Sequence, residues 1–315
     1  MEYIKLGSTD IVVSKLCFGS LTITPFQGNL SIEDGSKLIK YAYDKGVNFI
    51  DTAELYDNYN YINKALKLIG RQNYIIATKT YAYDAEGARK SLENALRELE
   101  TDYIDIFLLH EQESVHTIKG HYEAIEYFEK QKQKGIIRAI GISTHKISGV
   151  HGFNMYDNLD IIHPMINYTG LGILDGTRDE MLDAIDIAHK RGKGIYAMKV
   201  LGGGHHIPEV EKAVNFIRNI EAIDSYAIGM QSEDEVDCNI ILVGTGKYPE
   251  RFRDSLSKVK RRLIVADYCR GCSKCVEMCR HNGIELINGH AYVTKNCILC
   301  GYCANYCPDF CIKVI

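Results

Sequence analysis

The chain of 315 residues contains no tryptophan and only five prolines, and it lacks an excess of charge of either sign. The 37 Lys and Arg residues nearly balance the 41 Asp and Glu residues, and the formal net charge is −4. Nucleic-acid binding depends on a basic surface, so this balance argues against a nucleic-acid partner. No apolar run approaches the roughly 20 residues of a membrane span, and residues 1–5 do not begin a signal peptide. We therefore expect a cytoplasmic chain without a membrane partner.

The cysteines are concentrated in one part of the chain. Eleven are present, and nine of them lie between Cys269 and Cys311. Disulfide-forming cysteines of a secreted protein would be scattered, so this distribution does not suggest disulfides. Cys17 and Cys238 stand alone and are expected to be small buried hydrophobic residues. The change in composition near residue 265 predicts two domains, residues 1–262 and residues 263–315.

Short apolar runs alternate with amphipathic stretches in residues 1–262. Eight runs are predicted strands: residues 16–18, 49–50, 75–77, 104–109, 139–142, 161–162, 195–197 and 240–243. The stretches between them have helical periodicity, as in residues 85–99 and 180–191. This alternation favours an α/β fold, a closed (β/α)8 TIM barrel. A hairpin of residues 3–6 and 11–13 is expected to plug its floor. No Gly-x-Gly-x-x-Gly motif supports a Rossmann site.

Four polar residues stand where predicted strands end, which is where the catalytic groups of such a barrel lie. They are Asp51, Tyr56, Lys79 and His110. Singly, each has an ordinary explanation as a helix cap, a packed ring, a solvated lysine or a buried histidine. Together they suit the reduction of a carbonyl by hydride, because that reaction needs a proton donor at the oxygen. We expect Lys79 to lower the pKa of Tyr56, Asp51 to orient Lys79, and His110 to hydrogen-bond the substrate oxygen.

The order of these four residues resembles the catalytic tetrad of the aldo-keto reductase family. The matching segments are residues 51–56, 77–79 and 108–110, and the resemblance covers the whole predicted barrel. It implies an NAD(P)-dependent oxidoreductase that interconverts a small-molecule carbonyl and an alcohol. Tyr56 would act as general acid and base, and NADP(H) or NAD(H) would lie across the barrel mouth.

The resemblance also implies contacts to the nicotinamide. Ser143 and Thr144 match the family's segment after the fifth strand, although asparagine is common at the second of these positions. His163 stands where glutamine is common, and Met198 stands where an aromatic ring usually stacks on the nicotinamide. The resemblance therefore places these four side chains beside the reactive ring.

A second group of expected cofactor contacts comes from the end of the predicted barrel. Residues 241–245, which include Gly244 and Thr245, resemble the family's phosphate-binding loop after the eighth strand. Backbone amides at a helix start suit a bound anion. Arg251 falls where a contact to adenine or a 2′-phosphate is usual in the family.

Two runs of four cysteines repeat with a constant offset of 28 residues. Within each run the first three cysteines are separated by two residues, which lets three thiolates face one cubane. In two-cluster ferredoxins the fourth cysteine of each run ligates the other cluster. The predicted [4Fe–4S] ligands are Cys269, Cys272, Cys275 and Cys307 for one cluster, and Cys297, Cys300, Cys303 and Cys279 for the other. Zinc is the alternative, but structural zinc sites pair two knuckles of two ligands.

The cysteine-rich part resembles bacterial two-cluster ferredoxins, which implies a small α+β ferredoxin-like domain. It departs from them at Arg280, where proline commonly follows the fourth cysteine. Cys311 lies outside both runs and is expected to be a buried thiol. The clusters would serve electron transfer, redox sensing or stability.

The alternative to a reductase is an iron–sulfur electron-transfer protein that docks a flavoprotein and lacks nicotinamide chemistry. Hydride carries two electrons whereas each cluster accepts one. Exchange between the two therefore needs a flavoprotein or another one-electron redox partner.

Overall fold

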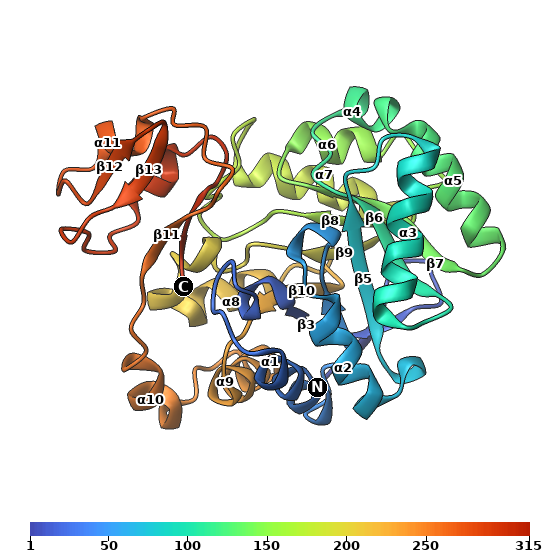
Figure 1. Cartoon of the computed structure of the whole chain (residues 1–315), viewed down its shortest axis with the longest axis horizontal. Coiled ribbons are helices and arrows are strands. Elements are labelled where there is room, and N and C mark those ends of the chain that lie inside the picture. The colour runs from blue at the N-terminus through green and yellow to red at the C-terminus, as the bar shows by residue number, and fades with distance from the viewer.

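Eight parallel strands close into a barrel in the computed structural model, which describes residues 1–315 (Figure 1). The strands are β3 (Leu16–Gly19), β4 (Phe49–Asp51), β5 (Ile75–Thr80), β6 (Ile104–Leu109), β7 (Ile137–Thr144), β8 (Ile161–Pro164), β9 (Gly194–Ala197) and β10 (Ser225–Gly229). They follow one another around the barrel in chain order, and β10 closes onto β3. The predicted (β/α)8 barrel is confirmed.

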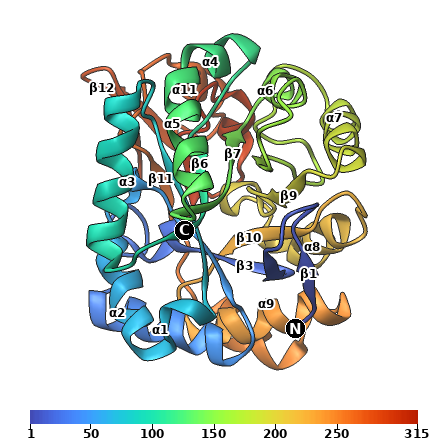
Figure 2. The ribbon, with the colours of Figure 1, turned by 90° about the vertical axis from the view of Figure 1, so that its right-hand side faces the viewer.

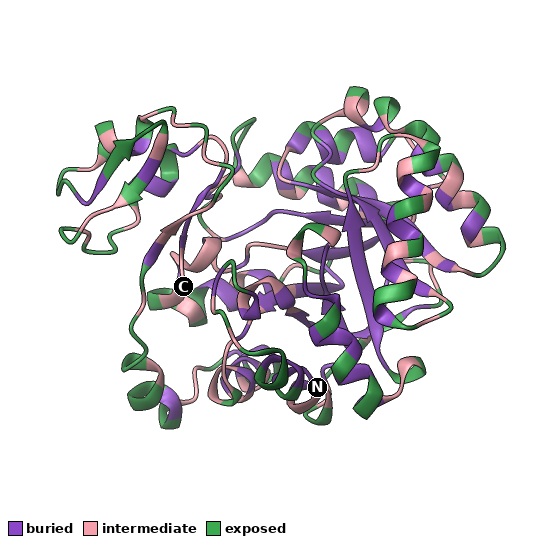
Figure 3. Ribbon diagram, viewed as in Figure 1, coloured by how far each residue is buried: buried purple, intermediate pink, exposed green.

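Helices cover the outside of this barrel (Figure 2). They are α1 (Ile32–Asp44), α2 (Tyr59–Ile69), α3 (Ala85–Leu99), α4 (Val115–Gly120), α5 (Tyr122–Gln133), α6 (Ile147–Phe153), α7 (Arg178–Lys190), α8 (Val210–Arg218), α9 (Glu233–Thr245) and α10 (Arg253–Ser257). Polar side chains start several of them: the Asp84 carboxylate accepts the Gly87 N–H at α3, and Thr177 and Glu180 form a capping box at α7. The strands are buried, whereas the outer helix faces are exposed (Figure 3). None of the helices is both long enough and apolar enough to cross a membrane.

The predicted N-terminal hairpin closes the floor of the barrel. β1 (Tyr3–Lys5) pairs antiparallel with β2 (Val12–Ser14). Leu6, Ile11 and Val13 are fully buried and pack with inward side chains such as Phe49 and Tyr196. Because apolar side chains fill the lower half, any ligand must enter from the opposite end, where the strands end.

The eighth strand is β10, and the prediction of a strand at residues 240–243 was wrong. Those residues lie inside α9, where Leu242 and Val243 are buried against the core. A run of Ile-Ile-Leu-Val is apolar on both sides and therefore resembles a buried strand. The true strand, Ser-Tyr-Ala-Ile-Gly, is weaker as an apolar signal because it begins with serine and ends with glycine.

Residues 263–315, called here the cysteine-rich segment, lie beside the open end of the barrel (Figure 1). β11 (Leu263–Val265) pairs antiparallel with β14 (Ile312–Val314), and β12 (Ile284–Ile287) pairs antiparallel with β13 (His290–Val293). A short helix, α11 (Lys274–Met278), and a 3-10 helix (Tyr302–Tyr306) complete the segment. It has a small core of its own, which includes four cysteines.

β14 docks against the loop that follows β9. The Gly204 backbone has a φ of 91°, and an added Cβ there would lie 1.9 Å from the Val314 carbonyl oxygen. The His205 ring nitrogen Nε2 lies 3.2 Å from the Ile312 carbonyl oxygen. Close backbone approach therefore needs glycine at position 204, and it brings the C-terminal strand to the barrel mouth.

We expect Gly141→Ala to destabilise the barrel. Gly141 lies where β7 passes β8, and an added Cβ would lie 1.7 Å from the Ile161 carbonyl oxygen. Overpacking of this kind costs about 1–3 kcal/mol or more of unfolding free energy. Urea denaturation measures the loss. Gly120→Ala is the control, because an added Cβ there meets no atom within 4 Å. Equal stability of the two variants would show that β7 and β8 are not packed this closely.

Candidate functional site

The structure brings the four predicted catalytic residues together at the open end of the barrel. Asp51 ends β4, Tyr56 ends a 3-10 helix (Glu54–Tyr56), Lys79 lies near the end of β5, and His110 follows β6. The Lys79 ammonium is 5.4 Å from the centroid of the Tyr56 ring, and the His110 and Tyr56 ring centroids are 6.1 Å apart. Asp51 and Tyr56 line a cavity of about 730 Å³.

A buried ion pair forms the base of this site. Lys79 is 1% exposed, and its ammonium donates to Asp51 Oδ1 at 2.6 Å and to the Thr52 carbonyl oxygen at 2.7 Å. The Tyr196 hydroxyl donates to the same carboxylate oxygen at 3.0 Å. These contacts fix Asp51 and Lys79 in place, and Asp51 orients the Lys79 ammonium, as expected from the sequence.

The expected lowering of the Tyr56 pKa by Lys79 is not found. Burial raises the pKa of the Tyr56 phenol well above its usual value, and the negative charge of Asp51 raises it further. The Lys79 ammonium donates its hydrogen bonds to Asp51 and Thr52 and not to the Tyr56 hydroxyl. Tyr56 is therefore a neutral phenol, which has a proton to donate.

His110 is a neutral imidazole with hydrogen-bonding capacity to spare. Burial lowers its pKa well below the usual value, and the charge of Lys79 lowers it further. Its Nδ1 atom is buried and has no hydrogen-bond partner. The ring stacks on Tyr81, whose hydroxyl donates to Glu111 Oε2 at 2.6 Å. His110 is therefore held by packing, and its buried Nδ1 atom is left without a hydrogen bond within the protein.

The four predicted nicotinamide contacts separate into two pairs. His163 and Met198 line the cavity. His163 stacks on Tyr196 with ring centroids 3.9 Å apart, and burial lowers its pKa to about 3. Ser143 and Thr144 are fully buried; Ser143 Oγ accepts the Glu111 N–H at 2.9 Å, and Thr144 Oγ1 accepts the Lys146 N–H at 3.0 Å. These hydroxyls support the loops around the site.

Gly244, Thr245 and Arg251 do not lie where a phosphate contact requires them. Gly244 and Thr245 lie in the last turn of α9, and a helix C-terminus repels an anion. Arg251 lies on a 3-10 helix (Glu250–Phe252) and is absent from the cavity lining. The prediction failed because it rested on the misplaced eighth strand.

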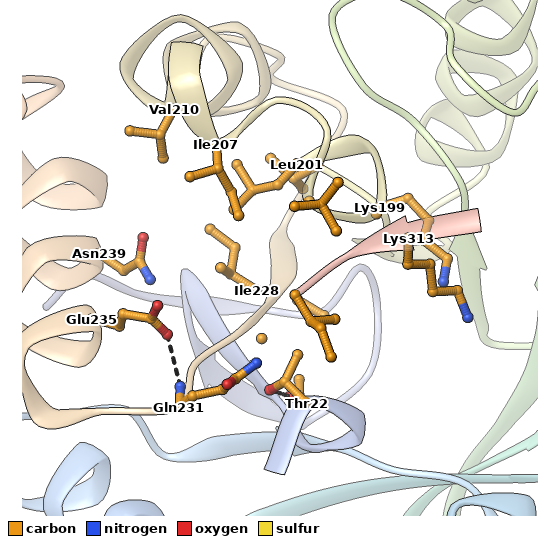
Figure 4. Close-up of a pocket in the computed structure, with 18 of the residues that line it drawn as sticks. Thr22, Lys199, Leu201, Ile207, Val210, Ile228, Gln231, Glu235, Asn239 and Lys313 are labelled. Carbon is orange, nitrogen blue, oxygen red and sulfur yellow. Dashed lines mark hydrogen bonds between the residues drawn. The ribbon is translucent and has the colours of Figure 1, made fainter. Parts of the chain in front are cut away.

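The loop after β10 and the N-terminal half of α9 line the cavity where the sequence placed Gly244, Thr245 and Arg251 (Figure 4). The Gln231 N–H donates to Glu235 Oε2 at 2.8 Å, and Asn239 is 7% exposed and lines the cavity. Arg253 and Arg261 add positive charge to this lining. The cavity thus runs from the catalytic residues along the loops after β9 and β10.

Sequence reasoning missed two cavity-lining lysines, Lys199 and Lys313. Lys199 follows Met198, and its backbone has a φ of 60°, which only the structure reveals. Such a conformation is unusual for a residue with a side chain and is common at functional sites. Lys313 belongs to β14, so its place at the barrel mouth depends on docking that no local pattern encodes.

The two predicted sets of cysteines line two separate cavities. One of about 520 Å³ is lined by Cys279, Cys297, Cys300 and Cys303. The other is narrower, about 10 Å³, and is lined by Cys269, Cys272, Cys275 and Cys307, together with Cys311. No three His, Cys, Asp or Glu side chains converge on a single metal ion. Cys307 lines the same cavity as the first run's trio, and Cys279 lines the same cavity as the second run's trio.

The backbone of the cysteine-rich segment repeats with the same offset as its sequence. Ser273 and Gly301 both have positive φ, as do Asn282 and Phe310. The Gly283 N–H donates to Cys279 Sγ at 3.2 Å, and the Cys311 N–H donates to Cys307 Sγ at 3.2 Å. Hydrogen bonds, first that from the Cys311 thiol, lower the pKa of Cys307 to about 6, and this sulfur is thus suited to the thiolate form.

Comparisons with known proteins agree with the fold. A family model described as "Aldo/keto reductase family" matches residues 15–222. The chain is 28% identical over 222 residues to L-galactose dehydrogenase of Arabidopsis thaliana, covering 65% of this chain and 66% of that protein. It is 32% identical over 183 residues to the aldo-keto reductase YhdN of Bacillus subtilis, covering 53% of this chain and 54% of that protein. The matches therefore span less than two thirds of these relatives.

A solved structure has the same barrel. The holo form of an aldo-keto reductase from Bacillus halodurans superposes with a TM-score of 0.66 at 22% identity, covering 82% of this chain and 96% of that one. At this identity the likeness concerns the fold. The family model matches well over half of the chain, and its match includes all four residues predicted to be catalytic. The chain belongs to the aldo/keto reductase family.

Proposed function

We propose that the barrel is an NAD(P)H-dependent oxidoreductase that reduces a small-molecule carbonyl. The observation that carries the proposal is the convergence of a neutral phenol, a neutral imidazole and a buried Lys–Asp pair at the open end of the barrel, where Tyr56 and Asp51 line the cavity. Membership of the family supports it. In the reduction, the carbonyl carbon gains hydride and its oxygen gains a proton, and the dihydronicotinamide is oxidised.

In this mechanism the catalytic residues act on the carbonyl oxygen. His110 hydrogen-bonds that oxygen and orients it, and Tyr56 donates its proton as negative charge develops there. The Lys79 ammonium, 5.4 Å from the Tyr56 ring, stabilises the phenolate that remains. Asp51 keeps Lys79 charged and in position. NADP(H) or NAD(H), when bound, supplies the hydride.

The size and lining of the cavity support a nicotinamide cofactor as its ligand. Its volume of about 730 Å³ is typical of a ligand pocket. His163 and Met198 line it near the catalytic residues, and Asn239 and Arg253 line it along the loops after β9 and β10. The first pair would hold the nicotinamide end, and the second pair would hold the adenosine end, in place of Gly244, Thr245 and Arg251.

We further propose that residues 263–315 are a separate ferredoxin-like domain with two [4Fe–4S] clusters, following residues 1–262. Two cavities lined by the two crossed cysteine sets support this assignment, and so does the repeated backbone with matching N–H to sulfur hydrogen bonds. The clusters would supply one-electron transfer, and their partner would be a flavoprotein or another one-electron carrier.

Replacing Tyr56 with phenylalanine tests the reductase. We expect kcat for carbonyl reduction to fall by about two to four orders of magnitude, because the proton donor is lost. Nicotinamide binding, followed by fluorescence titration, should be unchanged. Tyr83→Phe is the control, since Tyr83 is 65% exposed two residues beyond Tyr81. A Tyr56→Phe enzyme with the wild-type rate would refute the assigned role.

Metal analysis tests the clusters. We expect anaerobically reconstituted protein to contain about eight iron and about eight sulfide per chain. Cys300→Ser removes one ligand of the second set, so about half of the iron should be lost. Cys238→Ser is the control, because Cys238 lies in α9 outside both sets. Tightly bound zinc with negligible iron would contradict the assignment.

A further inference from the structure

Two lysines line the cavity of about 730 Å³, called here the main cavity, which Asp51 and Tyr56 also line. Neither lysine is one of the four predicted catalytic residues. Lys199 follows β9, and Lys313 comes from β14 of the cysteine-rich segment. Their side chains lie next to each other in Figure 4. A ligand in this cavity therefore contacts positive charge close to the reacting groups.

Both lysines lack a carboxylate partner. Glu111 is the acidic side chain that influences both, but its contacts are with the Tyr81 hydroxyl at 2.6 Å and with His145 at 3.7 Å. Asp51 is occupied by Lys79. Lys313 is nevertheless only 6% exposed. The Cys307 and Cys311 thiols are the other groups near Lys313 that can carry negative charge, and neither of them hydrogen-bonds its ammonium. A buried ammonium without a paired carboxylate is stabilised by a ligand that supplies the negative charge.

The cysteine-rich segment holds both ammonium groups in place. The Lys313 ammonium donates to the Tyr268 hydroxyl at 2.9 Å. The Lys199 ammonium lies 5.5 Å from the centroid of the Phe310 ring. Burial and the nearby charge of Lys199 together lower the pKa of Lys313 to about 7. This mutual repulsion is relieved when an anion binds between them.

We propose that Lys199 and Lys313 form a subsite for a carboxylate, so that the substrate is a carbonyl compound that also bears an acidic group. The inference rests on the proposed reductase function and names its substrate class. The carboxylate stays unchanged during turnover; hydride adds to the carbonyl carbon, and Tyr56 protonates the carbonyl oxygen. The cysteine-rich segment thereby supplies part of the substrate site.

The test compares succinic semialdehyde with its methyl ester, which differ in charge and little in shape. Wild-type protein should prefer the anion. In Lys313→Met, kcat/KM for the anion should fall by at least about 30-fold, which is the usual effect of removing one partner of a buried charge pair. The value for the ester should change by no more than about twofold, and Lys313→Arg should restore most of the preference. Lys260→Met, which removes an exposed lysine outside the cavity, should match wild type.

Three outcomes would overturn the proposal. Equal losses of kcat/KM for the anion and the ester in Lys313→Met would show that Lys313 has a structural role. Lys199→Met would then also lower kcat/KM equally for the two substrates. A raised KM for the nicotinamide with an unchanged preference would assign the lysines to the cofactor phosphates. If no carbonyl is reduced at all, the reductase proposal fails, and calorimetry with succinate still decides: equal binding by wild type and Lys313→Met would refute the subsite.

Discussion

The buried ion pair of Lys79 and Asp51 is the interaction on which the candidate site depends. Removing one partner of such a pair leaves an unpaired buried charge and costs about 3–5 kcal/mol. Here the pair also joins β4 to β5, and Asp51 accepts a hydrogen bond from the Tyr196 hydroxyl of β9. It therefore links three strands at the end of the barrel where Tyr56 lies. Lys79 is thus oriented before any ligand binds, and Tyr56 remains a neutral phenol.

The second constraint is the docking of β14 over the barrel mouth. A barrel of this kind builds its specificity from loops at one end, and in this chain a strand from beyond the barrel adds to them. Gly204 permits the backbone contact, and Lys313 then reaches the main cavity. Phe310 and Tyr268 from the same segment contact the two lysines. Loss of order in the cysteine-rich segment is therefore expected to change the lining of the main cavity.

The barrel could be predicted from the sequence because seven of its strands are apolar runs between periodic helices. The eighth was missed because residues 240–243 give the stronger apolar signal although they belong to α9. That error moved Gly244, Thr245 and Arg251 into the predicted phosphate site. Asp51, Tyr56, Lys79 and His110 were found because they follow strand ends. No local sequence pattern places Lys313 in the cavity, because its position depends on where β14 docks. The pKa of Tyr56 depends on burial, which the spacing of residues does not encode.

Isotope tracing shows whether hydride moves directly from the nicotinamide to the carbonyl carbon. NADPH or NADH carrying deuterium at C4 is incubated without oxygen and without a mediator, and the product is analysed by mass spectrometry. Direct hydride transfer leaves deuterium on the former carbonyl carbon of the alcohol, and this is the expected result. Product without deuterium, formed only when a reduced flavoprotein or another one-electron donor is added, would contradict it and would favour an electron-transfer protein.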